Sequence, residues 1–193
     1  MQKKALKPLL TKDHLNGKKN KVISNMISKI ATEYDDLYIS EILQRTKNIA
    51  MVGLSDNWNR PSYFVAKYLL DRGYKIFAIN PKKAGDKILG INVYPSFESI
   101  KDKIDMVDIF RNSKAALSVT QAALKIKPQT IWMQIGVKND KAAEIAKKNG
   151  IDVIMNRCPK IEYCRLSGEL GWAGINSGLF WNNRRIIRPI YKR

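Results

Sequence analysis

The sequence predicts an α/β fold, a Rossmann-like doubly wound parallel sheet of about five strands. From residue 49 to residue 155, short apolar runs alternate with longer amphipathic stretches. The first run, residues 49–53 (IAMVG), is almost wholly apolar and ends in glycine, a pattern typical of a strand buried on both faces of a parallel sheet. Strands and helices that alternate in this way are joined by right-handed crossovers, which place helices on both faces of the sheet.

We expect strands at residues 49–53, 75–80, 106–110, 130–135 and 152–155, with the first strand central in the sheet. Apolar residues at helical spacing predict helices at residues 61–72, 113–126 and 140–149, and a short helix at about residues 97–100. In the first helix Phe64, Val65, Tyr68 and Leu69 are expected to share one face, and Ser113 is expected to cap the second. The segment 81–95 is expected to consist mainly of turns, because proline and glycine recur in it.

The two ends of the chain differ from this core. Residues 1–20 are irregular and rich in lysine, which predicts a mobile basic arm. Apolar residues at helical spacing between Val22 and Leu43 predict one or two leading helices, so the main domain is expected to span residues 21–164. Residues 165–193 begin with a glycine-rich, aromatic stretch and end in a basic tail. We expect them to form an ordered extension packed on the domain.

The composition is that of a basic protein with one folded domain. The chain has 193 residues and a net charge of +18, with 45% hydrophobic and 27% charged residues. Residues 1–30 hold eight lysines and one acid, and residues 181–193 hold five basic residues and no acid. Basic ends of this kind bind nucleic acid or anionic lipid in some proteins. We favour the simpler interpretation of solvated tails.

Several classes of protein are excluded or disfavoured by the same counts. No apolar run approaches the roughly 18–20 residues that span a bilayer, and the N-terminus lacks the apolar core of a secretory signal. Two cysteines and one histidine argue against a disulfide scaffold and against a zinc site. We therefore expect a cytoplasmic protein in which Cys158 and Cys164 are reduced thiols. The sequence leaves a homo-oligomer open.

Polar and cationic residues follow every predicted strand, at the edge where doubly wound sheets bind ligands. The loop after the first strand offers Gly53 for a tight turn, Ser55 and Asn57 for hydrogen bonds, and Arg60 as a cation. Pro61 suits the first position of the next helix, so that backbone amides at the helix start can face an anion. The loop thus has the composition of a phosphate-binding loop without the G-x-G-x-x-G spacing.

The end of the second strand bears on which nucleotide would bind. Asn80, Pro81, Lys82 and Lys83 stand where an NAD-binding fold places an acid for the ribose. Two lysines at that point argue against NAD and favour a ligand with more phosphate. The remaining candidate residues follow the third, fourth and fifth strands: Phe110, Arg111, Gln134, Gly136, Asn156 and Arg157.

Five motifs in order, GLS-x4-RPS, INPK, MVDIFRNS, IWMQIGV and MNRCPKIEY, resemble the bacterial CoA-binding domain proteins. These are stand-alone relatives of the nucleotide-binding domain in the succinyl-CoA synthetase alpha subunit, and the resemblance covers about residues 40–165. It implies CoA or an acyl-CoA as the ligand, with no reaction assigned. Gly53, Ser55 and the following helix start would take the pyrophosphate or the 3′-phosphate, and Arg60 with Lys82 or Lys83 would supply countercharge. Phe110 would cover the adenine or ribose, and the residues after the fourth and fifth strands would line the far side.

We find no catalytic constellation in the sequence. The only histidine, His14, lies in the basic arm, and no Ser-His-Asp, paired-carboxylate or metal-ligand pattern is evident. Cys158 follows Arg157, whose charge would lower the pKa of a neighbouring thiol, although we favour a packed, unreactive residue. The sequence therefore predicts a CoA-binding protein without its own chemistry. Two alternatives stay open: an NAD(P)-dependent enzyme, and a nucleic-acid-binding redox or nucleotide sensor.

Overall fold

The computed structural model describes residues 34–169 and has the predicted α/β architecture. Its elements begin with α2 (Asp36–Arg45), β1 (Asn48–Val52), α3 (Pro61–Asp71), β2 (Lys75–Ile79), η1 (Pro81–Lys83), β3 (Lys87–Ile88) and β4 (Ile91–Tyr94). They continue with η2 (Phe97–Ser99), β5 (Met106–Ile109), α4 (Ser113–Leu124), β6 (Thr130–Met133), α5 (Asp140–Lys148), β7 (Asp152–Ile154) and α6 (Pro159–Ser167).

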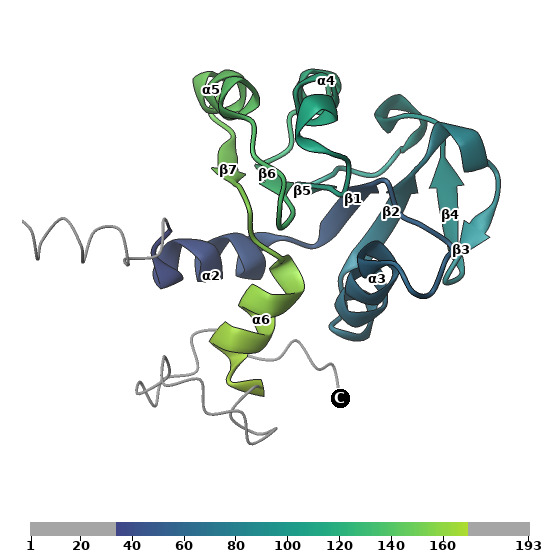
Figure 1. Cartoon of the computed structure of the whole chain (residues 1–193), viewed down its shortest axis with the longest axis horizontal. Helices are drawn as coiled ribbons and strands as arrows, with labels where there is room; N and C mark the ends of the chain where they lie inside the picture. Colours follow the sequence, from purple (N-terminus) through teal and green to yellow (C-terminus); the bar gives the residue numbers. More distant parts are fainter. Residues whose placement is uncertain (1–33, 170–193) are drawn as a thin grey trace, which may run out of the picture. The chain divides into compact units, whose positions relative to one another are not determined.

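The sheet has seven strands in the order β3-β4-β2-β1-β5-β6-β7, with β1 central as predicted. All neighbours pair in parallel except β3 and β4. Val52 at the end of β1 pairs with Ile79 on one side and Ile109 on the other, so three strands end at one level. Helices α4 and α5 cover one face of the sheet, and α2, α3 and α6 cover the other (Figure 1).

The strand count exceeds the expected five because β3 and β4 form a hairpin in the segment that we expected to be turns. Its two-residue loop, Leu89-Gly90, has positive φ at both positions, 52° and 75°. That geometry suits a type I′ turn, which usually carries Asn, Asp or Gly at both positions. Leucine at the first position gives no such signal. Ile88 and Val93 are buried and anchor the two short strands.

Two local expectations were wrong, and one helix was not predicted. Asn112, not Ser113, caps α4, because its side chain accepts a hydrogen bond from the Ala115 amide at 3.0 Å. Phe64 does not join the buried face of α3, since 46% of its surface is exposed. The sequence also did not predict α6, although Pro159 at its first turn and Gly168 with φ of 80° at its end are ordinary helix signals.

The basic arm expected at residues 1–20, the helix expected to start at residue 22, and the extension beyond residue 169 lie outside the described residues. The domain boundaries proposed at residues 21 and 164 therefore stay predictions. Within residues 34–169, the structure contains no helix of the length and apolarity that a membrane crossing requires.

Candidate ligand-binding site

Two pockets open at the carboxyl edge of the sheet, one on each side of the turn that follows β1. The first, which we call the α4 pocket, has a volume of about 420 Å³. It is lined by Val52, Gly53, Ile79, Asn80, Pro81, Lys82, Pro95, Ser96, Phe97, Glu98, Arg111, Ala115, Ser118, Val119 and Ala122.

The second, which we call the α3–α6 pocket, has a volume of about 750 Å³. It is lined by Gly53, Ser55, Asn59, Arg60, Pro61, Ser62, Phe64, Val65, Phe110, Gln134, Ile135, Val137, Cys158, Lys160 and Ile161. Gly53 lines both pockets, so the turn after β1 is the point at which they meet.

Both the backbone conformation at residue 53 and the neighbouring side chain of Arg111 require a glycine at this position. Its φ is +91°, a conformation that residues with a side chain rarely adopt. A Cβ at this position would lie 3.0 Å from Cδ of Arg111. The Gly53 amide also donates to the Ile79 carbonyl at 3.2 Å, which ties the turn to the end of β2. The turn therefore brings bare backbone to the junction of the two pockets.

The loop that follows is held by its own polar side chains. The Ser55 amide donates to Oγ of Ser62 at 3.1 Å, and Oγ of Ser55 accepts from the Asn57 amide at 3.1 Å. Asn57 in turn accepts from the Asn59 amide at 2.9 Å. Asn57 thus shapes the loop and lines neither pocket, whereas Ser55 lines the α3–α6 pocket.

Helix α3 starts as the sequence predicted. Arg60 is the residue before its first turn and makes no side-chain cap, and Pro61 occupies the first turn. Arg60 is exposed and lines the α3–α6 pocket. The positive end of the helix and one guanidinium therefore face this pocket beside Gly53.

The structure separates the two lysines that follow β2. Lys82 lines the α4 pocket together with Arg111, and Asn80 accepts from the Lys82 amide at 3.2 Å. Lys83 lies outside both pockets and forms an ion pair with Asp56. The hydrogen bond from Lys83 lowers the pKa of the Asp56 carboxyl. The α4 pocket thus holds two cations, Lys82 and Arg111, and one carboxylate, Glu98.

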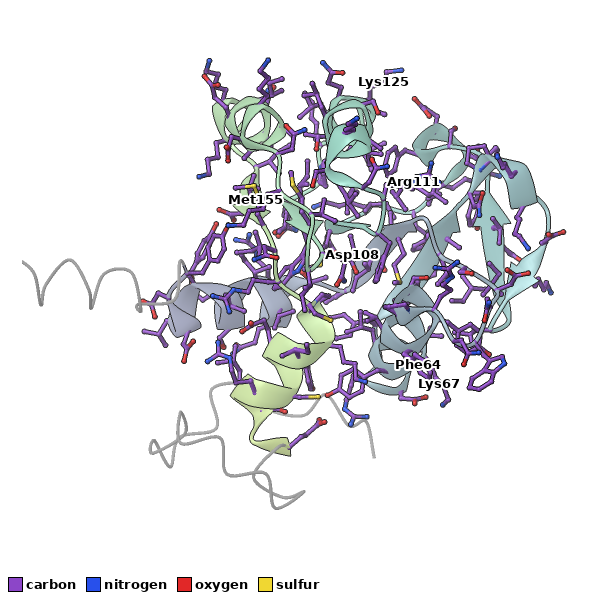
Figure 2. The ribbon with its side chains drawn as sticks, viewed as in Figure 1. Phe64, Lys67, Asp108, Arg111, Lys125 and Met155 are labelled. Carbon is purple, nitrogen blue, oxygen red and sulfur yellow. The ribbon has the colours of Figure 1, made fainter. Side chains whose placement is uncertain are left out.

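A buried acid lies behind the α3–α6 pocket. Gln134 is 6% exposed, and its Nε2 donates to both carboxyl oxygens of Asp108 at 3.0 Å. Asp108 is fully buried in β5, and burial raises its pKa to about 8. Figure 2 labels Asp108 in the interior, with Arg111 near α4 and Phe64 on α3. Asp108 was not among the predicted site residues, although an acid within an otherwise apolar strand (MVDIF) was a signal for it.

Cys158 lines the α3–α6 pocket but is not an activated thiol. It is 6% exposed, and burial raises its pKa to about 11. The guanidinium of Arg157 is directed to Glu162, with 3.5 Å between Nη1 and Oε1, and the Arg157 carbonyl accepts from Nε1 of Trp132 at 2.8 Å. Cys158 is thus the packed residue that we favoured, and the charge of Arg157 does not lower its pKa.

The loops after β6 and β7 hold each other. The Gly136 amide donates to Oδ1 of Asn156 at 2.8 Å, and Asn156 has a φ of 56°. Neither residue lines the α4 pocket or the α3–α6 pocket, and Arg157 does not either. The predicted residues that line one of these two pockets are Gly53, Ser55, Arg60, Asn80, Pro81, Lys82, Phe110, Arg111 and Gln134. Lys160, at the start of α6, is a lining cation that the sequence analysis did not identify.

Comparison with known proteins defines the class to which this fold and site belong. The family described as the CoA binding domain matches residues 47–164, and the chain belongs to this family. The Bacillus subtilis protein YneT, described as uncharacterized, is 39% identical over 125 residues, which cover 65% of this chain and 91% of YneT.

Larger proteins contain a related region. An ADP-forming acetate–CoA ligase of Methanocaldococcus jannaschii is 31% identical over 134 residues, which are 65% of this chain but 18% of the ligase. Among solved structures, Prb, a protein redesigned for binding, has a TM-score of 0.68 and 37% identity, covering 72% of this chain and 96% of Prb. A hypothetical protein from Pyrococcus horikoshii OT3 has a TM-score of 0.66 and 37% identity, covering 69% of this chain and 92% of the other.

Proposed function

We propose that the protein binds CoA, or an acyl thioester of CoA, across the two pockets, and has no catalytic centre of its own. The observation that supports this most is the junction at Gly53, where the α4 pocket, lined by Lys82 and Arg111, meets a larger pocket in front of the α3 N-terminus. The larger pocket has exposed apolar side chains at its mouth and is also lined by Arg60 and Lys160. CoA has a matching division. A phosphorylated adenosine forms one end, a pyrophosphate follows, and a long arm with little charge ends in a thiol.

In this proposal the α4 pocket holds the adenosine and its 3′-phosphate. Lys82 and Arg111 line this pocket and supply countercharge, and Asn80 and Pro81 form part of its wall. Charge-assisted hydrogen bonds to phosphate are worth roughly 1.5–3 kcal/mol each. Lys83 is occupied by Asp56 and is a weaker candidate for phosphate contact than Lys82.

The pyrophosphate then lies at the junction, and the arm enters the α3–α6 pocket. Gly53 and Ser55 would contact the pyrophosphate at the start of α3, with Arg60 beside them. Phe110 and Gln134 would contact the arm rather than the adenine, because they line the α3–α6 pocket. Four predicted residues would contribute indirectly, by holding the loops in place: Asn57, Gly136, Asn156 and Arg157.

A nicotinamide dinucleotide is the second candidate on this fold. NAD-binding folds place an acid near the end of the second strand, whereas NADP-binding folds place a cation there for the 2′-phosphate. Lys82 at the end of β2 disfavours NAD and is compatible with NADP. NADP is therefore the competitor that a binding experiment has to include.

The test is titration calorimetry on the full chain with CoA, 3′-dephospho-CoA, NAD and NADP. We expect CoA to bind best, 3′-dephospho-CoA to bind at least about tenfold more weakly for loss of one charged contact, and both dinucleotides to bind more weakly than CoA. Thermal unfolding checks the result independently, since a ligand at 100 times its dissociation constant adds about 2.7 kcal/mol to stability. Tighter binding of NADP than of CoA would overturn the proposal.

A further inference from the structure

Exposed apolar side chains gather at the mouth of the α3–α6 pocket. Among the described residues, the large hydrophobic side chains that are mostly or substantially exposed are Leu37, Trp58, Phe64, Ile135 and Ile161. Phe64, Ile135 and Ile161 all line this one pocket, with exposed fractions of 46%, 60% and 47%. They come from α3, from the loop after β6 and from α6. Exposed apolar residues that converge on one cavity mark a binding surface.

The inner end of the same pocket is polar. Gln134 and Cys158, each 6% exposed, line it there. The amide nitrogen of Gln134 is held by Asp108, so the group that Gln134 can offer a ligand is its oxygen, a hydrogen-bond acceptor. An acceptor oxygen at this depth disfavours a negatively charged ligand group.

Two cations also line the pocket, each at the start of a helix. Arg60 is exposed at the start of α3, next to the junction with the α4 pocket. Nζ of Lys160 lies 5.6 Å from the centre of the Tyr68 ring, an arrangement that stabilises the charge at the α3–α6 contact. The rim formed by Phe64, Ile135 and Ile161 is thus suited to an uncharged, apolar group.

We propose that the α3–α6 pocket receives the acyl chain of an acyl-CoA, and that the chain is uncharged and several carbons long. This rests on the proposed function, since it assumes that the pantetheine arm enters the same pocket. The volume of about 750 Å³ lies in the upper part of the range for small-molecule sites, which leaves room for an acyl chain beyond the arm. The thioester end of the ligand lies near Gln134 and Cys158, and the chain lies against Phe64, Ile135 and Ile161.

Calorimetry with CoA, acetyl-CoA, butyryl-CoA and hexanoyl-CoA tests this inference. Each methylene that the pocket buries is expected to tighten binding about fourfold, so affinity rises along the series. Succinyl-CoA is the matched ligand for butyryl-CoA, because both acyl groups have four carbons and succinyl has a carboxylate in place of the terminal methyl group. We expect it to bind more weakly than butyryl-CoA.

Two exposed positions connect the effect to this pocket. Ile135→Ser and Ile161→Ser are expected to reduce the increase in affinity from acetyl-CoA to hexanoyl-CoA. Leu37→Ser is the control, because Leu37 is 61% exposed on α2 and lines neither pocket. It is expected to leave the whole series unchanged. Circular dichroism verifies that each variant is folded, and the ligand series on the unaltered chain does not depend on the variants.

The outcomes separate this inference from the proposed function. If CoA binds but affinity is the same for every acyl chain, the acyl pocket is overturned and CoA binding stands. Tighter binding of succinyl-CoA than of butyryl-CoA would also overturn it, because the acyl group would then pair with Arg60 or Lys160. If neither CoA nor any thioester binds, the proposed function itself fails.

Discussion

The α4 pocket and the α3–α6 pocket share Gly53 but differ in chemistry because they lie on opposite faces of the sheet. Alternate residues of a strand point to opposite faces. On β5 and the loop that follows, Phe110 lines the α3–α6 pocket and Arg111 lines the α4 pocket. Asp108, two residues before Phe110, is bonded to Gln134 of the α3–α6 pocket. The same strand ends thus supply Lys82 and Arg111 to one pocket and Phe110 and Gln134 to the other.

The face beneath each pocket follows the same alternation. Val107 and Ile109 of β5, and Ile131 and Met133 of β6, belong to the apolar core beneath α4 and α5. The opposite face carries Asp108, behind the α3–α6 pocket. A buried acid is costly there, and nothing comparable is found among the described residues that line the α4 pocket. The α3–α6 side thus has a buried polar pair, Asp108 and Gln134, where the opposite face has apolar core residues.

The largest effect is expected from Asp108→Asn. Burial raises the pKa of Asp108 to about 8 from an ordinary value of 3.8, so the folded state keeps a proton that the unfolded chain releases near pH 4. This stabilisation is complete below about pH 4 and is lost as pH rises toward 8, by up to about 1.4 kcal/mol per pH unit. Asparagine has no such proton, so the stability of the variant relative to the unaltered chain should rise by that slope between pH 5 and pH 8.

Urea unfolding at four pH values between 5 and 8 measures the slope. Asparagine keeps an acceptor oxygen for Nε2 of Gln134, so the variant retains a hydrogen bond at the site. Parallel pH profiles for the two chains would show that Asp108 carries no proton in the folded state. The two faces of the sheet would then differ only in the shape and the exposed charges of their pockets, and not by a buried protonated acid.

The second effect concerns the residue that the pockets share. Gly53 and Gly85 have nearly the same φ, +91° and +92°, but a Cβ would meet Arg111 at Gly53 and nothing within 4 Å at Gly85. Alanine at either position should cost about 1–3 kcal/mol of stability through backbone strain. Only Gly53→Ala should also weaken CoA binding, by about tenfold or more, because Arg111 has to shift. Equal CoA affinities in calorimetry for the two variants would remove Gly53 from the site.

Much of this arrangement was predictable from sequence, because strand ends and buried apolar runs are local signals. The central β1, the glycine turn and Pro61 at the start of α3 were all confirmed. The separation of Lys82 from Lys83 was not predictable. It depends on an ion pair between Lys83 and Asp56, residues 27 positions apart that lie on two different loops.

Tertiary contacts also determine the direction of two further side chains. Cys158 stands next to Arg157 in sequence, but the Arg157 side chain turns to Glu162 of α6, a helix that the sequence did not predict. Asn156 is a polar residue at a strand end, where ligand-binding residues are expected, yet its side chain accepts a hydrogen bond from the Gly136 amide of another loop. The polar residues in the sequence were enough to predict that the site lies at the carboxyl edge of the sheet. The direction of each side chain at that edge depends on contacts between segments that are distant in sequence.

The third effect compares Lys82, which lines the α4 pocket, with Lys83, which lies outside it. Lys82→Ala should weaken CoA binding by roughly 1.5–3 kcal/mol, the value of a charged phosphate contact. Lys83→Ala is the matched control, and it should change affinity by less than about 1 kcal/mol, because its exposed ion pair with Asp56 lies outside the pocket. Calorimetry on both variants decides the matter. A larger loss for Lys83→Ala would place the phosphate outside the α4 pocket.

The smallest effect is a slow reaction that would mark where the CoA thiol lies. Cys158 lines the α3–α6 pocket, whereas Cys164 lines neither pocket and donates to Oη of Tyr68 at 3.0 Å. With CoA disulfide, the Cys158 thiolate attacks one sulfur, the disulfide breaks, and one CoA leaves as a thiolate while the other stays bonded to Cys158. A pKa of about 11 leaves roughly one thiol in a thousand ionised at pH 8, so the adduct should form slowly and about tenfold faster per pH unit.

Intact-mass spectrometry distinguishes the two thiols. The adduct should be lost in Cys158→Ser and kept in Cys164→Ser, because only the first side chain borders the space assigned to the pantetheine arm. An adduct that is kept in Cys158→Ser and lost in Cys164→Ser would place the arm toward the far end of α6, near Tyr68. The thioester would then lie at the rim of the α3–α6 pocket and the acyl chain at its inner end. An absence of adduct at pH 9 in a chain that binds CoA would mean that the thiol stops short of Cys158. Its sulfur would then serve only to fill the inner end of the pocket beside Gln134.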